Sequence, residues 1–536
     1  MMTRLHLGSI AAGAMALLIS VAGCGGGGDD DATNSAERGT LVIALPTQPE
    51  NLNPIYGDNV YEGNQKFFNG LLRYAKDLSP EPDVASALPT RSTNGKTVTV
   101  KLRDDVNFTD EQPLTSKDVV FTYKAILDPK NASPLVGLLD SVDDVKAVDM
   151  TTVRFDLNRP DPAFLDKLQI GIVPEHLLRG KKLETAAFNT KPVGTGPYVI
   201  DEFKPGGRIV MVANEKYFRG APKIKRIVLS AVEDENARAA QLENGTVDVV
   251  GVVPKLAPRL RKDQDITVYE VSSADARVMA IPNRDPVLRD AAVRRALSLA
   301  IDREKMVSGV LAGAGEPAYG PIMKGHWAYD PVVEKPFDPD EAGRQLDAAG
   351  WTRSANGTRE KAGRMMSFTA YYRTGDSVRK DVALAFSSDL AKIGVDAEVK
   401  GITFDVLETK PDSGANVFGY GTPYDPDLEL YTLFHSKFAN DDDAFSNYPR
   451  NWTAAIDAAL DAERSTLDRE ERKRDFARLQ AQLSDDASWM YLVRLRHVVA
   501  ASKRIEGIDP ITEPHAHGFS RGTSWNLEDW TLKPKD

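Results

Sequence analysis

The sequence of 536 residues contains one cysteine, Cys24, so the chain can form no internal disulfide bond. It also lacks a surplus of positive charge, because 67 Lys and Arg stand against 78 Asp and Glu, and no basic block has aromatic neighbours. Proteins that bind nucleic acid need such a basic footprint, so we predict no nucleic-acid partner. Beyond the N-terminal leader, no run approaches the ~20 apolar residues of a membrane-spanning helix.

The motifs of common enzyme active sites are missing as well. There is no Gly-x-Ser-x-Gly nucleophile elbow and no His-Glu-x-x-His zinc motif. Gly194-Thr-Gly196 lacks the Gly-Lys-Ser/Thr ending of a phosphate-binding loop and runs into Pro197. We therefore expect neither a catalytic site nor a cofactor, with a secreted hydrolase as the remote alternative.

The N-terminus has the features of an export signal. Arg4 and His6 precede an apolar stretch, 10–22, which is too short to span a membrane. The stretch ends in Val-Ala-Gly before Cys24, which resembles the bacterial lipobox, whose cysteine carries the lipid. We predict a lipoprotein signal peptide at 1–23, lipidation of Cys24, and an extracytoplasmic protein anchored to the cell membrane, in the periplasm or at the cell surface. A signal peptide with a chance cysteine is the alternative.

The Gly- and Asp-rich residues 24–38 predict a flexible tether. After it, strand and helix patterns alternate to the C-terminus, which predicts an α/β protein. The patterns predict strands at 40–45, 97–102 and 395–399 and helices at 115–128, 290–300, 340–349, 378–393 and 469–483.

Several segments together resemble the extracellular solute-binding proteins of family 5, the peptide- and nickel-binding class. In family order they are Leu102–Phe108 with Pro113–Phe121, Pro192–Tyr198, Asn214–Tyr217 with Gly220–Pro222, Leu242–Asp248, Val293–Arg303, Phe337–Ala342, Ala349–Trp351 and Asp389–Gly394. The resemblance covers nearly the whole mature chain. It concerns the capped helices and tight turns of a scaffold, and it does not identify the ligand.

The resemblance implies two lobes joined by a two-strand hinge, with the ligand in the cleft between them. Lobe I would consist of 39–70, 191–285 and 500–536, with an inserted subdomain at 71–190, and lobe II of 286–499. The implied function is that of a monomeric substrate-binding protein that delivers peptides to an ABC permease and its ATPase. A nickel chelate, a sugar or an opine-like compound as ligand, and a peptide-sensing role, remain open.

In the family, the loop after the first strand lines the cleft. Here that loop offers Tyr56, Asp58 and Asn59, although Asn-Pro and Gly-Asp pairs in it are also ordinary turn formers. The second lobe would supply an extended segment beside which a peptide could pair by its backbone. The residues of this segment are Val417, Phe418, Gly419 and Tyr420; a core strand is the alternative.

Peptide receptors of this class hold the free amino end with an Asp three residues before an Asp-Pro or Glu-Pro pair. The pair here is Asp425-Pro426, and the residue at that spacing is Thr422. A buried ammonium group needs a carboxylate partner. Either Asp425 or Asp427 substitutes, or the ligand has no free amine.

For a ligand carboxylate, arginine is the favoured partner because its planar fork binds both oxygens. Arg373 and Arg379 lie at or near the start of the helix predicted at 378–393, where dipeptide receptors of this class place an arginine, with Lys380 beside them. A solvated surface cluster is the alternative. His515-Ala-His517 is the only close histidine pair, and without a third ligand we predict no metal site.

Overall fold

In the computed structural model, the chain is described at residues 39–47, 51–57, 66–204, 207–403, 405–406, 414–438, 449, 453–515 and 521–533. The predicted signal peptide, Cys24 and the tether lie outside the described residues, as do Asp58, Asn59 and His517. Within the part described, no helix is both long enough and apolar enough to cross a bilayer.

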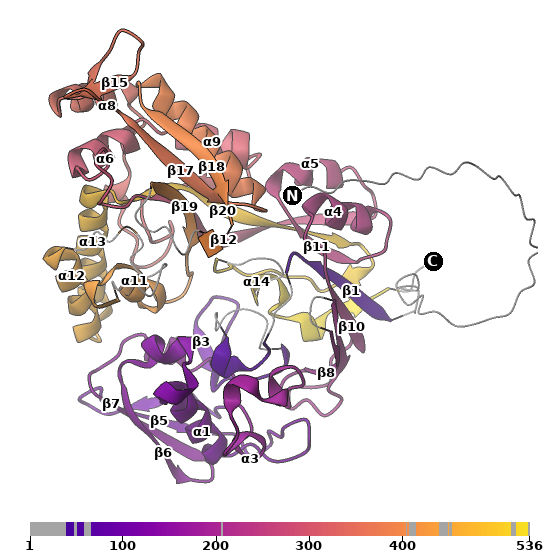
Figure 1. Cartoon of the computed structure of the whole chain (residues 1–536). Coiled ribbons are helices and arrows are strands. Elements are labelled where there is room, and N and C mark those ends of the chain that lie inside the picture. Colours follow the sequence, from indigo (N-terminus) through magenta and orange to yellow (C-terminus); the bar gives the residue numbers. More distant parts are fainter. Residues whose placement is uncertain are drawn as a thin grey trace, which may run out of the picture.

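One mixed sheet runs through the whole molecule (Figure 1). Its order is β18 (Asp396–Ile402), β17 (Ser367–Arg373), β19 (Ala415–Tyr420), β12 (Ile266–Ala280), β20 (Trp489–Ser502), β11 (Val249–Val252), β1 (Thr40–Leu45), β10 (Arg226–Ala231), β9 (Arg208–Ala213) and β8 (Tyr198–Phe203), with β13 (Gly315–Pro317) also on β20. It contains both parallel and antiparallel pairs, as is common in α/β proteins.

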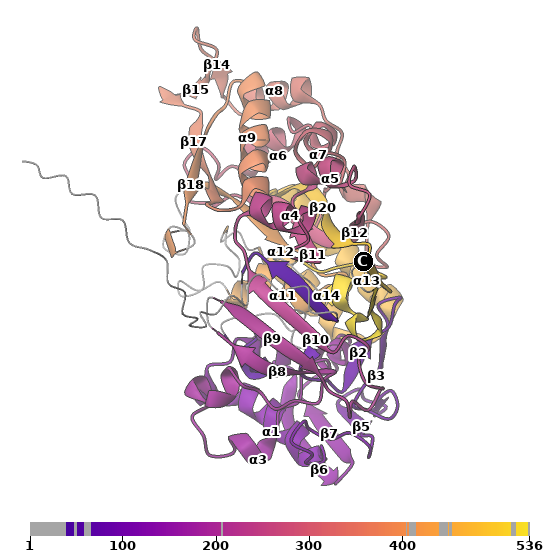
Figure 2. The same cartoon turned by 90° about the vertical axis from the view of Figure 1, so that its right-hand side faces the viewer.

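Two long strands, β12 and β20, join the halves of this sheet. The residue pairs between β12 and β20 that begin with Ile266 opposite Ser502 lie beside β11. The pairs from Ala276 onward lie beside β19. The register shifts between Ser272 and Ala276, so the strands bend where they pass from one half to the other. The two-strand hinge is thus confirmed. We name the half with β1–β11 and the C-terminal segment lobe I, and the half with β13–β19 lobe II (Figures 1 and 2).

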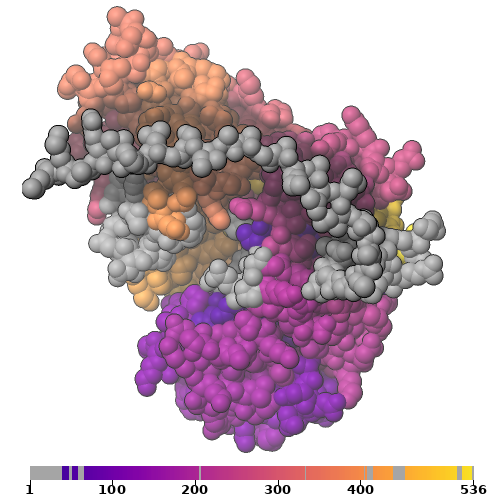
Figure 3. Space-filling model, turned by 45° about the vertical axis from the view of Figure 1, so that its right-hand side comes forward, coloured from indigo at the N-terminus to yellow at the C-terminus, as the bar shows by residue number. Residues whose placement is uncertain are grey.

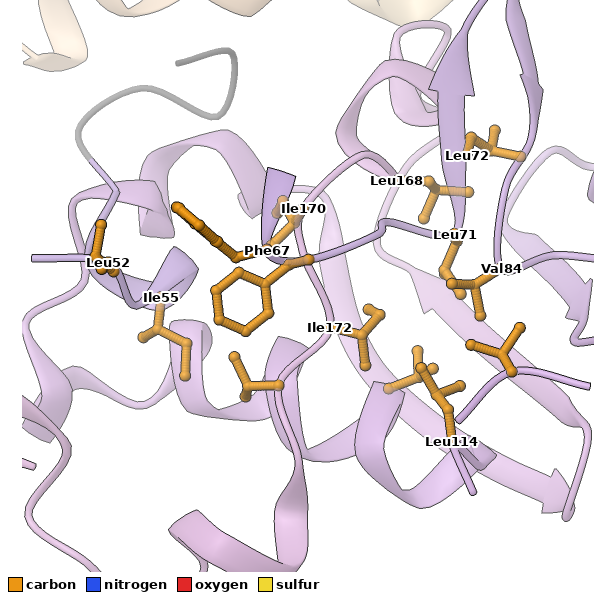
Figure 4. Close-up of a cluster of buried hydrophobic side chains, with 14 of the residues drawn as sticks. Leu52, Ile55, Phe67, Leu71, Leu72, Val84, Leu114, Leu168, Ile170 and Ile172 are labelled. Atoms are coloured by element: carbon orange, nitrogen blue, oxygen red, sulfur yellow. The ribbon is translucent and has the colours of Figure 1, made fainter. Parts of the chain in front are cut away.

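Lobe I carries a second sheet at its far end, of order β4-β5-β7-β6. Its strands are β4 (Thr90–Arg91), β5 (Thr97–Lys101), β7 (Thr152–Leu157) and β6 (Val142–Asp149). Helix α1 (Ser116–Leu127) packs on β6 and β7, and its predicted capping box is present, with Thr115 and Asp118 bonding reciprocally. The apolar core beneath includes Phe67, Leu114 and Ile172 (Figure 4).

Lobe II is a three-layer structure in which helices cover both faces of the sheet. Side chains alternate along β12, so Met279 belongs to one apolar cluster and Val278 to the other. The first face is covered by α6 (Ala291–Leu299), α7 (Arg303–Val310), α8 (Pro339–Ala348) and α9 (Ser377–Lys392). The second is covered by α11 (Asp427–Phe434), α12 (Ala454–Ser465) and α13 (Arg469–Asp486).

The remaining elements are short. In lobe I they are β2 (Leu72–Tyr74), β3 (Pro80–Pro82), α2 (Phe164–Lys167), α3 (Glu175–Leu178), α4 (Glu235–Glu243), α5 (Ala257–Leu260), β21 (Ile505–Glu506), α14 (Arg521–Ser524) and β22 (Thr531–Leu532). Strands β14 (Thr352–Arg353), β15 (Arg359–Lys361) and β16 (Arg364–Met365) form a small sheet in lobe II. The predicted helices and strands agree with the observed ones to within a few residues. The predicted domain boundaries stay predictions.

Candidate functional site

A cavity of about 230 Å³ lies beside the hinge strands, between the lobes. Lobe I contributes Glu233, Glu235 and the end of β11, and lobe II contributes 373–378, where β17 passes into α9. Arg277 of β12 and His497 of β20 line it from the hinge. The surface is recessed between the indigo-to-magenta lobe I and the orange lobe II (Figure 3).

Arg379 follows the segment 373–378 that lines this cavity, and its Nε lies 3.3 Å from Asp376 Oδ2. Asp376 caps α9 by accepting a hydrogen bond from the Arg379 backbone N–H at 2.9 Å, which places the side chain in the first helical turn. The side chain is only 7% exposed, and its Nε donates no hydrogen bond to any described residue. Burial, followed by repulsion from Arg277, lowers the pKa of Arg379 to about 10.

Gly419 of β19 leaves the space into which two arginines point. A Cβ atom at this residue would lie 2.6 Å from Arg277 Nη1, 2.9 Å from His515 Cε1 and 3.0 Å from Arg379 Nη2. The three cationic or ionisable groups therefore surround one point next to the strand backbone. A side chain at this position would therefore displace these three groups.

Asp275 connects Arg277 and His515 to His497 of the hinge strand β20. Its Oδ1 accepts a hydrogen bond from Arg277 Nη1 and lies 2.8 Å from His515 Nδ1, while its Oδ2 lies 3.0 Å from His497 Nε2. The other ring nitrogen of His497 shares a hydrogen bond with Glu513. Burial alone would raise the pKa of Asp275, but Arg277 and the two histidines hold it well below its ordinary value.

A second interlobe cavity, of about 590 Å³, lies beside the segment that follows β19. Its wall from lobe I consists of 77–80 and Asp166, and its wall from lobe II includes 323–327 and 423–425. Tyr74 and Tyr424 stack across the lobes beside it, with ring centroids 3.7 Å apart. Burial, and then the charge of Asp425, raise the pKa of Asp166 to about 7.

Both carboxylates that we considered as partners for an amino group of the ligand form ion pairs with arginines. Asp425 receives two hydrogen bonds from Arg472, at 2.6 and 2.8 Å. Asp427 is bound by both Nε and Nη2 of Arg464. Thr422 accepts a weak hydrogen bond from the Tyr424 backbone N–H. The roles of Thr422 and Asp425 as ligand contacts stay predictions.

The other predicted residues fall into different environments. Tyr56 ends a 3-10 turn (Pro54–Tyr56) that Asn53 caps, and it packs on the lobe I core. Val417 belongs to the core under α9, and Phe418 and Tyr420 pack on the opposite face. Arg373 lines the 230 Å³ cavity, and Lys380 is exposed. Their ligand contacts likewise stay predictions.

The backbone of β19 is paired on one side throughout, since Asn416 to Tyr420 lie opposite Ala280 to Ala276 of β12. On its other side, only Ala415 and Asn416 are matched with β17. The stretch from Val417 to Tyr420 therefore has no strand partner on that edge among the described residues. An edge of this kind can accept an extended peptide.

Sequence reasoning missed Asp275, Arg277 and the bridging role of His497. A signal was present, because the two charged residues stand among small and apolar residues in the second half of this strand, and buried charges in a core strand require partners. His497 stands alone in the sequence. Its two carboxylate partners come from residues 222 and 16 positions away.

Comparison with known proteins relates the chain to a known family. Residues 79–442 match the family described as bacterial extracellular solute-binding proteins, family 5 Middle. Protein XP55 of Streptomyces lividans is 38% identical over 501 residues, covering 93% of this chain and 91% of XP55. Two solved structures each match 92% of this chain, and the match covers 99% of the chain in each solved structure. NikZ from Campylobacter jejuni in complex with Ni(L-His) has a TM-score of 0.85 at 29% identity, and AppA from Bacillus subtilis in complex with a nonapeptide has 0.79 at 26%.

Proposed function

Because the chain belongs to the bacterial extracellular solute-binding proteins of family 5, we propose that it is the lipid-anchored, extracytoplasmic receptor of an ABC importer that captures peptides and passes them to the permease. In this role the two lobes close over a solute by bending at β12 and β20, and no bond of the solute is broken. Hinged closure allows both lobes to contact the ligand, so binding shifts the population toward the closed form.

The observation that carries the proposal is the pair of interlobe cavities, together with the partly unpaired edge of β19. The larger cavity, about 590 Å³, is within the range of small-ligand sites, roughly 300–1,000 Å³. Backbone pairing along 417–420 would bind peptides with little regard to side chains. The similarity to AppA, solved with a nonapeptide, supports this ligand class.

The direct test is uptake. A deletion strain should import labelled peptides more slowly than the parent, and a plasmid copy should restore the rate. Purified protein should gain thermal stability from a peptide mixture, by about 2.7 kcal/mol at a hundredfold excess over Kd. Unchanged uptake together with a lost transcriptional response would identify a sensor, and turnover of a chromogenic ester or glycoside would identify a hydrolase.

A metal–amino-acid chelate is the second candidate. It is favoured by the similarity to NikZ, solved with Ni(L-His), and by the position of His515 between two arginines beside Gly419. Imidazole is a suitable nickel ligand, and arginine suits the carboxylates of a chelate. Calorimetry with the nickel–histidine complex tests it, and His515→Ala should abolish any binding that depends on the imidazole.

A further inference from the structure

We propose that Asp166 of lobe I receives a positively charged group of the ligand, and that capture of such a solute in the larger cavity expels a proton from this carboxyl group. The inference rests on the proposed function and deepens it, because it names a charge that the captured solute must carry. It depends on the position of a carboxyl group that the fold leaves without a cation among the described residues.

Asp166 lies in the short helix α2 and lines the 590 Å³ cavity. Its side chain is partly exposed, its Oδ1 accepts a hydrogen bond of 2.6 Å from the Tyr74 hydroxyl, and no described cation forms an ion pair with it. Asp77, an acid on the same wall, is exposed and accepts a hydrogen bond from the Ser79 backbone. An ammonium group beside Asp77 would keep most of its water, so Asp166 is the better partner.

The missing cation matters because the lobes bring two acids to one cavity. Lobe II contributes Asp425 to the cavity wall, and Asp425 already receives two hydrogen bonds from Arg472. Burial, and then the charge of Asp425, raise the pKa of Asp166 to about 7, so this carboxyl group holds a proton over much of the acidic range. A cation that enters the cavity would supply the missing charge, and Asp166 would ionise to pair with it.

The other charged groups near Asp166 already have partners. Arg91 donates a hydrogen bond of 2.7 Å to the Asp161 carbonyl, and the Asp161 carboxylate pairs with Lys167. Arg472 is shared between Asp425 and Glu463. None of these cations can turn to Asp166 without leaving a buried acid unpaired, which is costly. The partner of Asp166 therefore has to come from the solute.

The cations of the cavity wall do not exclude a positive solute. Burial lowers the pKa of His326 to about 4, so this imidazole is neutral at neutral pH. Lys324 is exposed and lies 3.7 Å from Glu334. The guanidinium of Arg469 lies over the Trp327 ring, 4.9 Å from its centroid. These groups leave Asp166 as an acceptor for a compact ammonium group.

The sign of the pH dependence follows from the proton. Only ionised Asp166 pairs with a cation, so the affinity for a cationic solute should rise with pH until the carboxyl group is ionised. With a pKa of about 7, binding at pH 6 should release about 0.9 proton, and the affinity should rise about fivefold from pH 6 to pH 7. A peptide α-amino group stays largely charged over this range, because its pKa is about 7.7–8.0.

Calorimetry of the full mature protein at pH 6, in buffers of different ionisation enthalpy, counts the released protons. The probes are trialanine, N-acetyl-trialanine and putrescine. We expect trialanine to bind with release of about 0.9 proton, and N-acetyl-trialanine, which lacks the charge, to bind at least tenfold more weakly.

The other outcomes separate this inference from the proposed function. Trialanine binding without proton release, or binding of N-acetyl-trialanine as tight as that of trialanine, would overturn the inference and leave the peptide receptor standing. Binding of putrescine alone, with proton release, would support the cation site and overturn the peptide proposal. Binding of putrescine alone without proton release, or no binding of any probe, would overturn both.

Asp166→Asn assigns the proton to this residue. The amide has the shape of the protonated acid and keeps an oxygen for the Tyr74 hydroxyl, so the variant should fold. It should release no proton, bind trialanine at least tenfold more weakly at pH 7 and lose the dependence on pH. Asp143→Asn, at an exposed carboxylate of β6 in the same lobe, is the matched control and should keep the wild-type proton release and an affinity within twofold. Undiminished proton release in Asp166→Asn would overturn the assignment.

Discussion

Tyr74 of lobe I and Tyr424 of lobe II stack face to face, with planes 4° apart and centroids separated by 3.7 Å. Tyr74 also donates a hydrogen bond of 2.6 Å to Asp166. The pair ties the far ends of the lobes together at a distance from the hinge. The described conformation is therefore stabilised by contacts between the lobes themselves.

Replacing Tyr74 with alanine should shift the ligand-free protein toward an open form. Aromatic pairs contribute about 0.5–1.5 kcal/mol beyond their buried area, which changes a two-state population up to roughly tenfold. Small-angle scattering should show a larger radius of gyration for Tyr74→Ala. The exposed Phe337→Ala is the control, and identical scattering of Tyr74→Ala and wild type would mean that the stack does not hold the lobes closed.

The fold could be predicted where its signals are local. Thr115 and Asp118 specify the start of α1 by themselves, and Gly394, with φ of +83°, ends α9 where a side chain would be strained. The two ends of the strand Thr40–Leu45 could likewise be predicted from the local sequence.

The site could be predicted only in part, because its chemistry depends on partners distant in sequence. The place of Arg379 at a helix start could be predicted, but the pairing of Asp425 with Arg472, 47 residues away, could not. Periodicity shows which face of a strand is buried and does not show which charges meet there. Arg277 therefore became visible only when β12, β19 and α9 were placed together.

Gly419→Ala should weaken ligand binding about tenfold, which is 1.4 kcal/mol, without unfolding the protein. The added methyl group would lie within 3.0 Å of the tips of Arg277 and Arg379, and these flexible side chains can move only by giving up their converging geometry. Calorimetry with whichever probe binds the wild type checks this.

The matched control is Gly309→Ala. Gly309 lies inside α7, and a Cβ atom there meets nothing within 4 Å. The change should stabilise the fold by about 0.5–1 kcal/mol and leave affinity unaltered. An equal loss of affinity in both variants would point to a general effect of added side chains, contrary to our interpretation of Gly419.

Cys24→Ser should release the protein from the membrane fraction, because the predicted lipid anchor would have no other attachment point in a chain with one cysteine. Fractionation and detection of lipid labelling check it. A variant that still pellets with membranes would show that the lipobox assignment is wrong. Ser35→Ala, in the same tether, is a control that should leave the fractionation unchanged.

Stability should fall as the pH rises above neutrality, because of His497. Burial alone lowers the pKa of this histidine, but its hydrogen bonds with Asp275 and Glu513 raise it to about 9. Since the folded pKa exceeds the unfolded value of about 6.5, the contribution is complete below pH 6.5 and is lost by about pH 9. The loss is on the order of 3 kcal/mol, and urea unfolding at a series of pH values measures it.

His497→Gln should remove most of this pH dependence and lower stability at pH 6.5, where the charged imidazole bridges the two acids. His176→Gln, at a partly exposed histidine paired with Asp110 on the surface, should leave the pH profile of wild type intact. A flat profile in wild-type protein between pH 6.5 and 9 would exclude a charged His497 at the hinge.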